Sequence, residues 1–227
     1  MRKVVFTLLL ALVLAGCGGG RGSASSKGTA TLWVTRDRGS QVLFAGRVPA
    51  GLSAMQALER KLKVTTRYGG RFAQSIDGVS GSVSSQHDWF YFVNGIEADT
   101  SAAAVRLRAG DVEWWDYRSW AGSAMSVPVV AGAFPEPFVH GFDWARPGAA
   151  VTGGAPSVAK LLAREVHGTV GATGASPNRI AIEAALPPGT VEIARHGNGV
   201  WLTLGTAAAA RLAHDPHALR FRYGTTE

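Results

Sequence analysis

The sequence has one cysteine, Cys17, among its 227 residues, so no disulfide can form within the chain. It also has no apolar run of the roughly 20 residues that a membrane-spanning helix needs, because the run Val4 to Val13 is too short. The formal net charge of +7 is spread thinly along the chain. Nucleic-acid-binding proteins gather basic residues on one face, so the charge pattern argues against a nucleic-acid partner.

Motifs of catalysis and cofactor binding are also missing. The chain has no Gly-x-Ser-x-Gly elbow, no phosphate-binding loop and no dinucleotide fingerprint. His214 and His217 have a spacing that suits a metal, but Pro216 between them indicates a turn and no second ligand cluster supports them. We therefore expect no enzyme, no metal site and no cofactor.

Residues 1–16 are predicted to be a lipoprotein signal peptide. A positively charged start precedes the short apolar run, which ends in Leu14-Ala15-Gly16-Cys17, a tetrapeptide that resembles a bacterial lipobox. In a lipobox the cysteine carries acyl chains, and each buried methylene contributes about 0.8 kcal/mol to anchoring. We expect lipidation, including palmitate, at Cys17, followed by a Gly- and Ser-rich flexible tether that completes residues 17–28. The protein would then sit on the cell membrane, facing the exterior or periplasm.

The roughly 200 residues after the tether suffice for one large or two small domains. The distribution of tryptophan favours two, because the first half holds most of the seven tryptophans: Trp33, Trp89, Trp114, Trp115 and Trp120. We expect an α+β chain with a β-rich domain at 29–122, a linker rich in Gly, Ala and Pro at 123–154, and a small α+β domain at 155–227.

Local patterns predict the first elements of the β-rich domain. Strands at 30–35 and 42–48 are joined by Asp37 to Gly39, which suits a hairpin turn. Ser53 begins a helix, and Gln56 three residues later completes a capping box.

Aromatic and β-branched residues predict the later strands of this domain. The run at 89–93 is a strong strand signal, and Asn94-Gly95 after it favours a tight hairpin. Further strands are expected at 104–108 and 112–118. Because Trp114 and Trp115 must face opposite sides of the last strand, we expect at least one exposed ring surface.

The second domain is expected to combine two helices with short strands. Ser157 is predicted to cap a helix that runs to His167, and Thr206 to cap an alanine-rich helix that ends near His214. Predicted strands are 179–184, 191–194, 200–204 and 218–223.

An ordered set of motifs carries a family resemblance. These are Val48-Pro49-Ala50-Gly51-Leu52 before the helix, Arg71 to Val79, Asp88-Trp89-Phe90-Tyr91-Phe92-Val93-Asn94-Gly95, and Gly110-Asp111-Val112-Glu113-Trp114-Trp115-Asp116-Tyr117. Through them, residues 30–118 resemble the transcobalamin-like C-terminal domain family, a bacterial domain of unknown function. The family is similar to the smaller lobe of the vitamin B12 carriers intrinsic factor and transcobalamin. The resemblance implies a β-grasp-like fold and, more weakly, a corrinoid such as cobalamin as ligand.

The aromatic motifs supply the candidate site. Rigid rings hold a planar ligand at little entropic cost, and a few polar groups fix its orientation. The predicted ligand-binding residues are Trp89, Tyr91, Asn94, Trp114, Trp115, Asp116 and Tyr117. The same rings can instead fill a small β core.

Two functions remain open at this point. The first is a lipid-anchored extracellular protein that captures or presents a small planar ligand, such as a corrinoid, for a membrane importer or transporter. The alternative is an envelope protein–protein interaction module without a small ligand, because exposed apolar patches often mark such contacts. A concave aromatic pocket would favour the first, and a flat patch or an open sheet edge the second.

Overall fold

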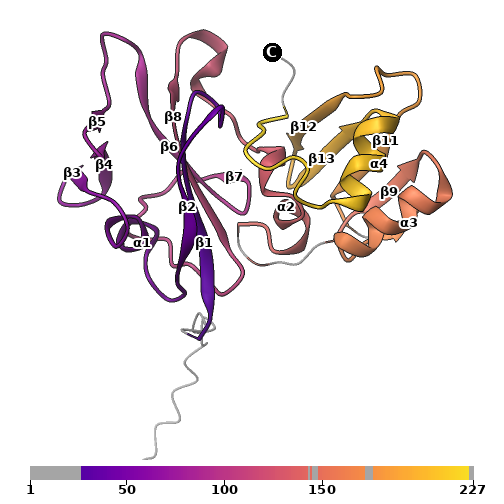
Figure 1. Cartoon of the computed structure of the whole chain (residues 1–227), viewed down its shortest axis with the longest axis horizontal. Coiled ribbons are helices and arrows are strands. Elements are labelled where there is room, and N and C mark those ends of the chain that lie inside the picture. The colour runs from indigo at the N-terminus through magenta and orange to yellow at the C-terminus, as the bar shows by residue number, and fades with distance from the viewer. Residues whose placement is uncertain (1–26, 143, 145–147, 172–175, 225–227) are drawn as a thin grey trace, which may run out of the picture.

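The structure is a computed structural model that describes residues 27–142, 144, 148–171 and 176–224. The predicted signal peptide, Cys17 and nearly all of the predicted tether lie outside these residues. Two units stand side by side, joined by a segment that contains helix α2 (Glu136–Val139) (Figure 1). No helix among the described residues is long and apolar enough to cross a membrane.

The first unit contains two sheets and one short helix. Its elements are β1 (Thr29–Arg36), β2 (Gln41–Pro49), α1 (Ala54–Glu59), β3 (Val64–Arg67), β4 (Phe72–Ile76), β5 (Val79–Ser80), β6 (His87–Val93), β7 (Ile96–Glu97) and β8 (Val112–Ser119). The larger sheet has the order β2-β1-β8-β6-β7, with β1 and β8 parallel and the other neighbours antiparallel. The smaller sheet, β3-β4-β5, is antiparallel.

Both faces of the larger sheet are buried. One face packs on α1 and the smaller sheet, through Leu32, Tyr91 and Trp115 among others. The opposite face carries Trp33 and Trp114. It is covered by side chains that come from beyond β8: Val127, Val130, Ala133, Phe221 and Tyr223. The first seven residues of β8 are consequently all buried.

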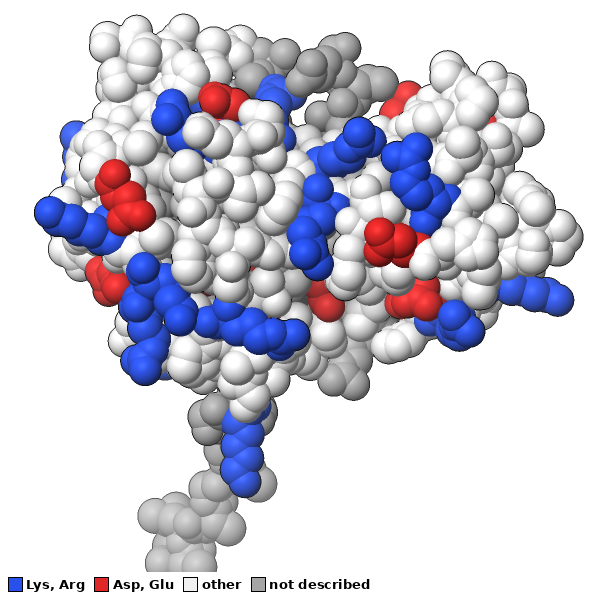
Figure 2. Space-filling model, in the orientation of Figure 1, with Lys and Arg blue, Asp and Glu red and all other residues white. Residues whose placement is uncertain are grey.

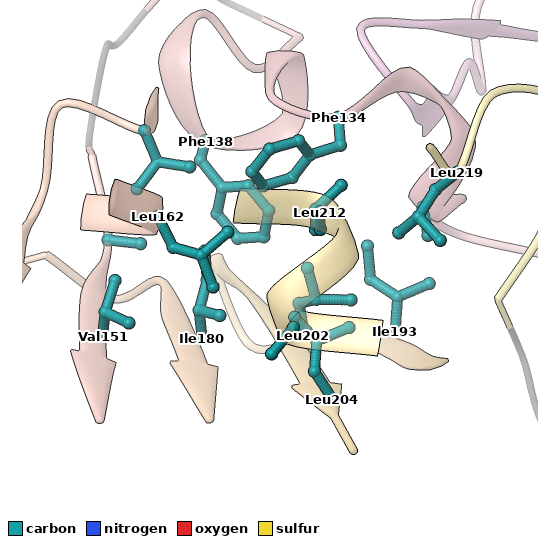
Figure 3. Packing of buried hydrophobic residues seen from close by; sticks show 14 of the residues in the cluster. Phe134, Phe138, Val151, Leu162, Ile180, Ile193, Leu202, Leu204, Leu212 and Leu219 are labelled. Carbon is teal, nitrogen blue, oxygen red and sulfur yellow. The ribbon is translucent and has the colours of Figure 1, made fainter. Parts of the chain in front are cut away.

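The second unit is a mixed sheet covered by helices. Its elements are β9 (Ala150–Gly153), α3 (Pro156–Glu165), β10 (Thr169–Val170), β11 (Arg179–Ile182), β12 (Val191–His196), β13 (Gly199–Leu204) and α4 (Thr206–His214). The order is β10-β9-β11-β13-β12, parallel except for the β12–β13 hairpin. Figure 3 shows its core, in which Leu162 and Leu212 of the helices meet Val151, Ile180 and Leu202 of the strands. The chain is therefore α+β, as predicted.

The segment predicted as a linker, 123–154, takes part in this packing. It contains the 3-10 helices η1 (Gly122–Met125) and η2 (Ala131–Ala133), together with α2 and strand β9. Phe134 and Phe138 are almost fully buried in the core of the second unit (Figure 3). The described residues of the segment therefore contribute to two hydrophobic cores, one on the larger sheet of the first unit and one in the second unit.

Four local predictions differ from the structure. Thr206 is the first residue of α4, and Gly205 rather than Thr206 stands at the N-cap. Residues 104–108 form only an isolated bridge, Ser53 to Arg106, rather than a strand. The helix α3 begins at Pro156, which has the fixed φ suited to a first position, so Ser157 is not its cap. Residues 218–221 form turns and 222–223 belong to no strand, because the N–H groups of Ala218, Arg220 and Arg222 each donate to the carbonyl three residues earlier.

Candidate ligand-binding site

A cavity of about 480 Å³ lies in the first unit, where the smaller sheet meets the β6 side of the larger one. Its volume falls within the range of about 300–1,000 Å³ that small-molecule sites occupy. The cavity is lined by the β3–β4 hairpin, by the loops before β6 and after β7, and by residues of β6 itself. Its lining residues span more than fifty positions of the sequence, from Arg67 to Trp120, and the fold brings them together.

Three of the predicted residues, Trp89, Tyr91 and Trp115, form one wall of the cavity. They lie on the same face of the larger sheet, where Tyr91 pairs with Trp115 across the β6–β8 ladder. The rings of this pair stack with centroids 4.8 Å apart and planes 19° apart. Such offset stacking contributes about 0.5–1.5 kcal/mol beyond the area buried. The wall is therefore rigid before any ligand arrives.

Internal partners satisfy the polar atoms of this wall. The Trp89 Nε1–H donates to the carbonyl of Val79 at 2.9 Å, and the Tyr91 hydroxyl donates to the carbonyl of Thr100 at 2.6 Å. Burial raises the pKa of Tyr91 to about 12, against the hydrogen bond to Thr100, which lowers it. The phenol is therefore neutral at physiological pH, and the wall offers a ligand ring surface rather than charge.

A buried carboxyl group holds the Trp115 ring from the neighbouring position on the same face of β8. Glu113 is fully buried, and its Oε1 accepts a 2.6 Å hydrogen bond from Nε1 of Trp115. Burial raises the pKa of Glu113 well above its usual value, against this hydrogen bond. The hydrogen bond therefore fixes the orientation of the indole ring, and burial favours the neutral form of the carboxyl group.

The rim of the cavity carries aromatic side chains that the sequence interpretation missed. Tyr68 is 75% exposed and Phe72 is 57% exposed, and their rings meet edge to face at 5.8 Å. Phe90 and Trp120 line the cavity as well. The sequence does contain a signal for these exposed rings. Tyr68 and Phe72 flank the Gly69-Gly70 turn, and aromatic residues are unusual there because hairpin tips are usually polar.

The polar lining of the cavity is of mixed sign. The side-chain oxygen of Gln74 is buried, lines the cavity and has no hydrogen-bond partner among the described residues. An unsatisfied buried acceptor costs about 1–3 kcal/mol, so a ligand N–H or O–H that reached it would be stabilised. Both signs of charge line the cavity, which includes Arg67, Arg71, Asp88, Glu97 and Asp99.

The other predicted site residues lie elsewhere. Tyr117 shares the wall's face of the sheet, but it packs on Trp89 at 5.2 Å and donates to the Ser80 carbonyl at 3.0 Å, outside the cavity. Asn94 is fully buried at the β6–β7 hairpin, where its Nδ2 donates to Asp111 Oδ1 at 2.7 Å and to the carbonyl of Gly141 at 2.8 Å. It therefore has a structural role there.

Trp114 and Asp116 occupy the covered face of the larger sheet. Both are fully buried, and Thr35 joins them: the Trp114 Nε1–H donates to the Thr35 hydroxyl at 2.8 Å, which donates to Asp116 Oδ1 at 2.5 Å. The Tyr223 hydroxyl completes this chain at 2.6 Å from Asp116 Oδ2. The expectation of an exposed ring here is wrong, because the second face of β8 is covered by the segment that follows it and by the end of the chain.

No group of three or more His, Cys, Asp or Glu side chains that could hold a metal ion occurs among the described residues. On the face shown in Figure 2, basic side chains are spread over both units with acidic ones among them.

Fold and cavity together define an α+β protein whose first unit holds a hollow walled by aromatic rings. Residues 51–119 match the model of a family described as DUF4430, a domain of unknown function. This range lies largely within residues 30–118, which resemble the transcobalamin-like C-terminal domain family. No curated protein matches the chain.

Two solved structures are similar to part of the chain. One is a protein from Ruminococcus gnavus ATCC 29149 to which metal binding has been ascribed, with 19% identity and a TM-score of 0.34, over 41% of this chain and 98% of that one. The other is haptocorrin in complex with Cbi, with 12% identity and a TM-score of 0.33, over 39% of this chain and 25% of that one. At these TM-scores neither likeness establishes a shared ligand.

Proposed function

We propose that the protein binds a small, partly planar ligand in the cavity of its first unit. The observation that carries this proposal is the rigid wall of Trp89, Tyr91 and Trp115 beside a hollow of about 480 Å³. Stacked rings bind planar groups at little entropic cost, and the unpartnered oxygen of Gln74 offers one orienting contact. Binding would rest on stacking and hydrogen bonding, without covalent chemistry.

A corrinoid is the first ligand to test, because the sequence motifs resemble a domain of vitamin B12 carriers. Such a ligand would rest on the rim with one part inserted into the cavity of about 480 Å³. The exposed rings of Tyr68 and Phe72 stand where the rest of the ligand would lie. A concave site of this kind supports a small ligand over the alternative of a flat interaction module.

The setting of this activity is also part of the proposal. The lipobox-like motif supports a lipid anchor at Cys17 on the outer side of a membrane, from which a bound ligand would pass to an importer. The sheet order β2-β1-β8-β6-β7, with its parallel central pair and α1 on one face, supports a β-grasp-like arrangement.

Removal of the two rim rings tests the ligand site. In Tyr68→Ala and Phe72→Ala, we expect three- to tenfold weaker binding of cobalamin or a planar aromatic probe, since each ring contributes about 1 kcal/mol of stacking. Quenching of intrinsic tryptophan fluorescence reports binding, because Trp89 and Trp115 line the cavity. The free energy of unfolding should change little, because both side chains are exposed.

The matched control for these variants is Trp201→Ala, which removes a partly exposed ring from the second unit. Its affinity for the probes should equal that of the original protein. Equal affinities in all three variants, or no saturable binding of cobalamin, haem or aromatic probes, would count against the cavity as a ligand site.

Replacement of the predicted lipidated residue tests the anchor. Cys17→Ser should move the protein from the membrane fraction to the soluble fraction, because a serine in this motif receives no acyl chains. Fractionation of cells that express each form, followed by immunoblotting, measures the distribution. If the serine variant stayed tightly membrane-bound, the anchor would have to lie elsewhere.

A further inference from the structure

The outer edge of strand β6 borders the cavity. The even-numbered residues of β6 hydrogen-bond inward to β8, as the Asn94 N–H to Val112 carbonyl bond of 2.8 Å shows at the end of the ladder. Backbone groups of the odd-numbered residues therefore point away from β8. At one end His87 pairs with Ser82 through this edge, and at the other the Tyr91 carbonyl accepts from the Ala98 N–H at 3.0 Å.

Between these two contacts the edge is open. The Trp89 N–H is occupied by its neighbour's carboxylate, Asp88 Oδ1, at 2.8 Å. Among the described residues, no hydrogen bond reaches the Trp89 carbonyl or the Tyr91 N–H. The native chain thus leaves one acceptor and one donor, two residues apart, on a short gap in a sheet edge.

The two open groups, together with the occupied groups beside them, favour one direction for a partner strand. In a parallel ladder, one residue donates its N–H to the carbonyl of residue i−1 of the neighbouring strand and accepts from the N–H of residue i+1. A residue opposite Phe90 would meet the Trp89 carbonyl and the Tyr91 N–H in this way. In an antiparallel ladder, the two residues that flank the one opposite Phe90 would meet these groups instead. Those residues would also turn an N–H toward the Tyr91 carbonyl and a carbonyl toward the Trp89 N–H, which Ala98 and Asp88 already occupy. A parallel partner leaves no peptide group facing an occupied one, so the parallel direction is favoured.

The cavity lies at this gap. Trp89, Phe90 and Tyr91 line it, together with the flanking contacts around Ser82 and Ala98. In a paired strand, side chains on either side of the residue opposite Phe90 would fall on the face of Trp89 and Tyr91. They would thus rest against the aromatic wall.

We propose that the cavity binds a short peptide in extended conformation, which adds one parallel residue to the edge of β6 and places its flanking side chains on the aromatic wall. The inference rests on the proposed function, since it uses the same cavity and names the ligand class. Main-chain pairing of this kind supplies affinity, and the pocket for alternate side chains supplies selectivity.

Two N-methylated peptides test the pairing. The probe Ac-Phe-Ala-Phe-NH₂ places alanine opposite Phe90 and both phenylalanines on the wall. Methylation of the alanine nitrogen removes the N–H that meets the Trp89 carbonyl, and we expect at least tenfold weaker binding, about 1.4 kcal/mol. Methylation of the second phenylalanine nitrogen, which points away from β6, is the matched control and should change affinity little. Isothermal titration calorimetry with the full chain measures all three peptides.

A pair of variants tests the protein side. Tyr91→Val and Tyr91→Pro both lose the phenol ring, but only proline removes the edge N–H, a loss that edge strands tolerate. The proline variant should bind the unmethylated peptide several-fold more weakly than the valine variant, with circular dichroism to show that both fold. Should proline not fold, the methylated peptides decide.

The outcomes separate the two proposals. Equal affinity of the two methylated peptides overturns the pairing, and weaker binding of the peptide methylated at the second phenylalanine overturns its parallel direction. In either case, if naphthalene sulfonate still binds, the planar-ligand function stands. If neither peptide nor naphthalene sulfonate binds, both proposals fail.

Discussion

Trp114→Ala is expected to lower the free energy of unfolding by about 3–5 kcal/mol, the usual cost of removing a buried tryptophan. The indole is fully buried and contacts Trp33, Phe92 and Tyr223, with ring centroids 6.0, 5.8 and 5.4 Å away. Its Nε1–H also donates to the Thr35 hydroxyl. The cavity left by alanine would lie where the chain end meets the larger sheet, so both units should lose stability together.

Urea denaturation followed by far-UV circular dichroism measures this loss. Trp201→Ala provides the comparison, because that tryptophan is 37% exposed on the second unit and its removal should cost no more than about 1 kcal/mol. If the two alanine variants unfolded at the same urea concentration, the segment that covers Trp114 would not be holding the two units together.

Local features of the fold could be predicted from the sequence. Ser53 and Gln56 form the predicted capping box, with bonds of 2.9 and 3.1 Å. Asn94 and Gly95 adopt the positive φ angles, 53° and 78°, that a tight hairpin requires. Each depends on residues a few positions apart, whose geometry the local sequence determines.

What could not be predicted depends on distant segments. The opposite orientations of Trp114 and Trp115 follow from strand geometry, and the structure confirms them. Whether either ring reaches solvent depends on what covers each face, and Tyr223, more than a hundred residues along the chain, covers Trp114. No periodicity within β8 carries that information.

The same limit explains the mixed result for the candidate site. Motif residues Trp89, Tyr91 and Trp115 line the cavity because they share one face of the sheet. Asn94 and Asp116 belong to the same motifs, but their polar groups are consumed by buried contacts with the rest of the chain. A motif therefore located the correct strands, while the long-range packing decided which of their side chains remain beside a hollow.

Asp116 is the second residue whose loss should be severe. Its two oxygens accept from the Thr35 and Tyr223 hydroxyls and from the backbone N–H groups of Arg38 and Gly39, at 2.5, 2.6, 3.1 and 3.2 Å. Asp116→Ala would leave these donors without an acceptor, at about 1–3 kcal/mol for each that stays buried and unpaired. We expect a total loss of at least about 3 kcal/mol in the free energy of unfolding. Asp99→Ala, at an exposed position, should change it by less than about 0.5 kcal/mol.

Asp116→Asn separates hydrogen bonding from charge. Asparagine keeps one acceptor oxygen but turns an N–H₂ group toward a backbone donor, so a loss of about 1–3 kcal/mol is expected. Burial raises the pKa of Asp116 above its ordinary value of 3.8, against the hydrogen bonds it accepts. A raised native pKa stabilises the fold below the unfolded value, and that contribution is lost as the pH rises through the native value. The difference in free energy of unfolding between the original protein and Asp116→Asn should therefore narrow as the pH rises from 3.8. A difference that widened instead would show that the fold favours the ionised carboxylate.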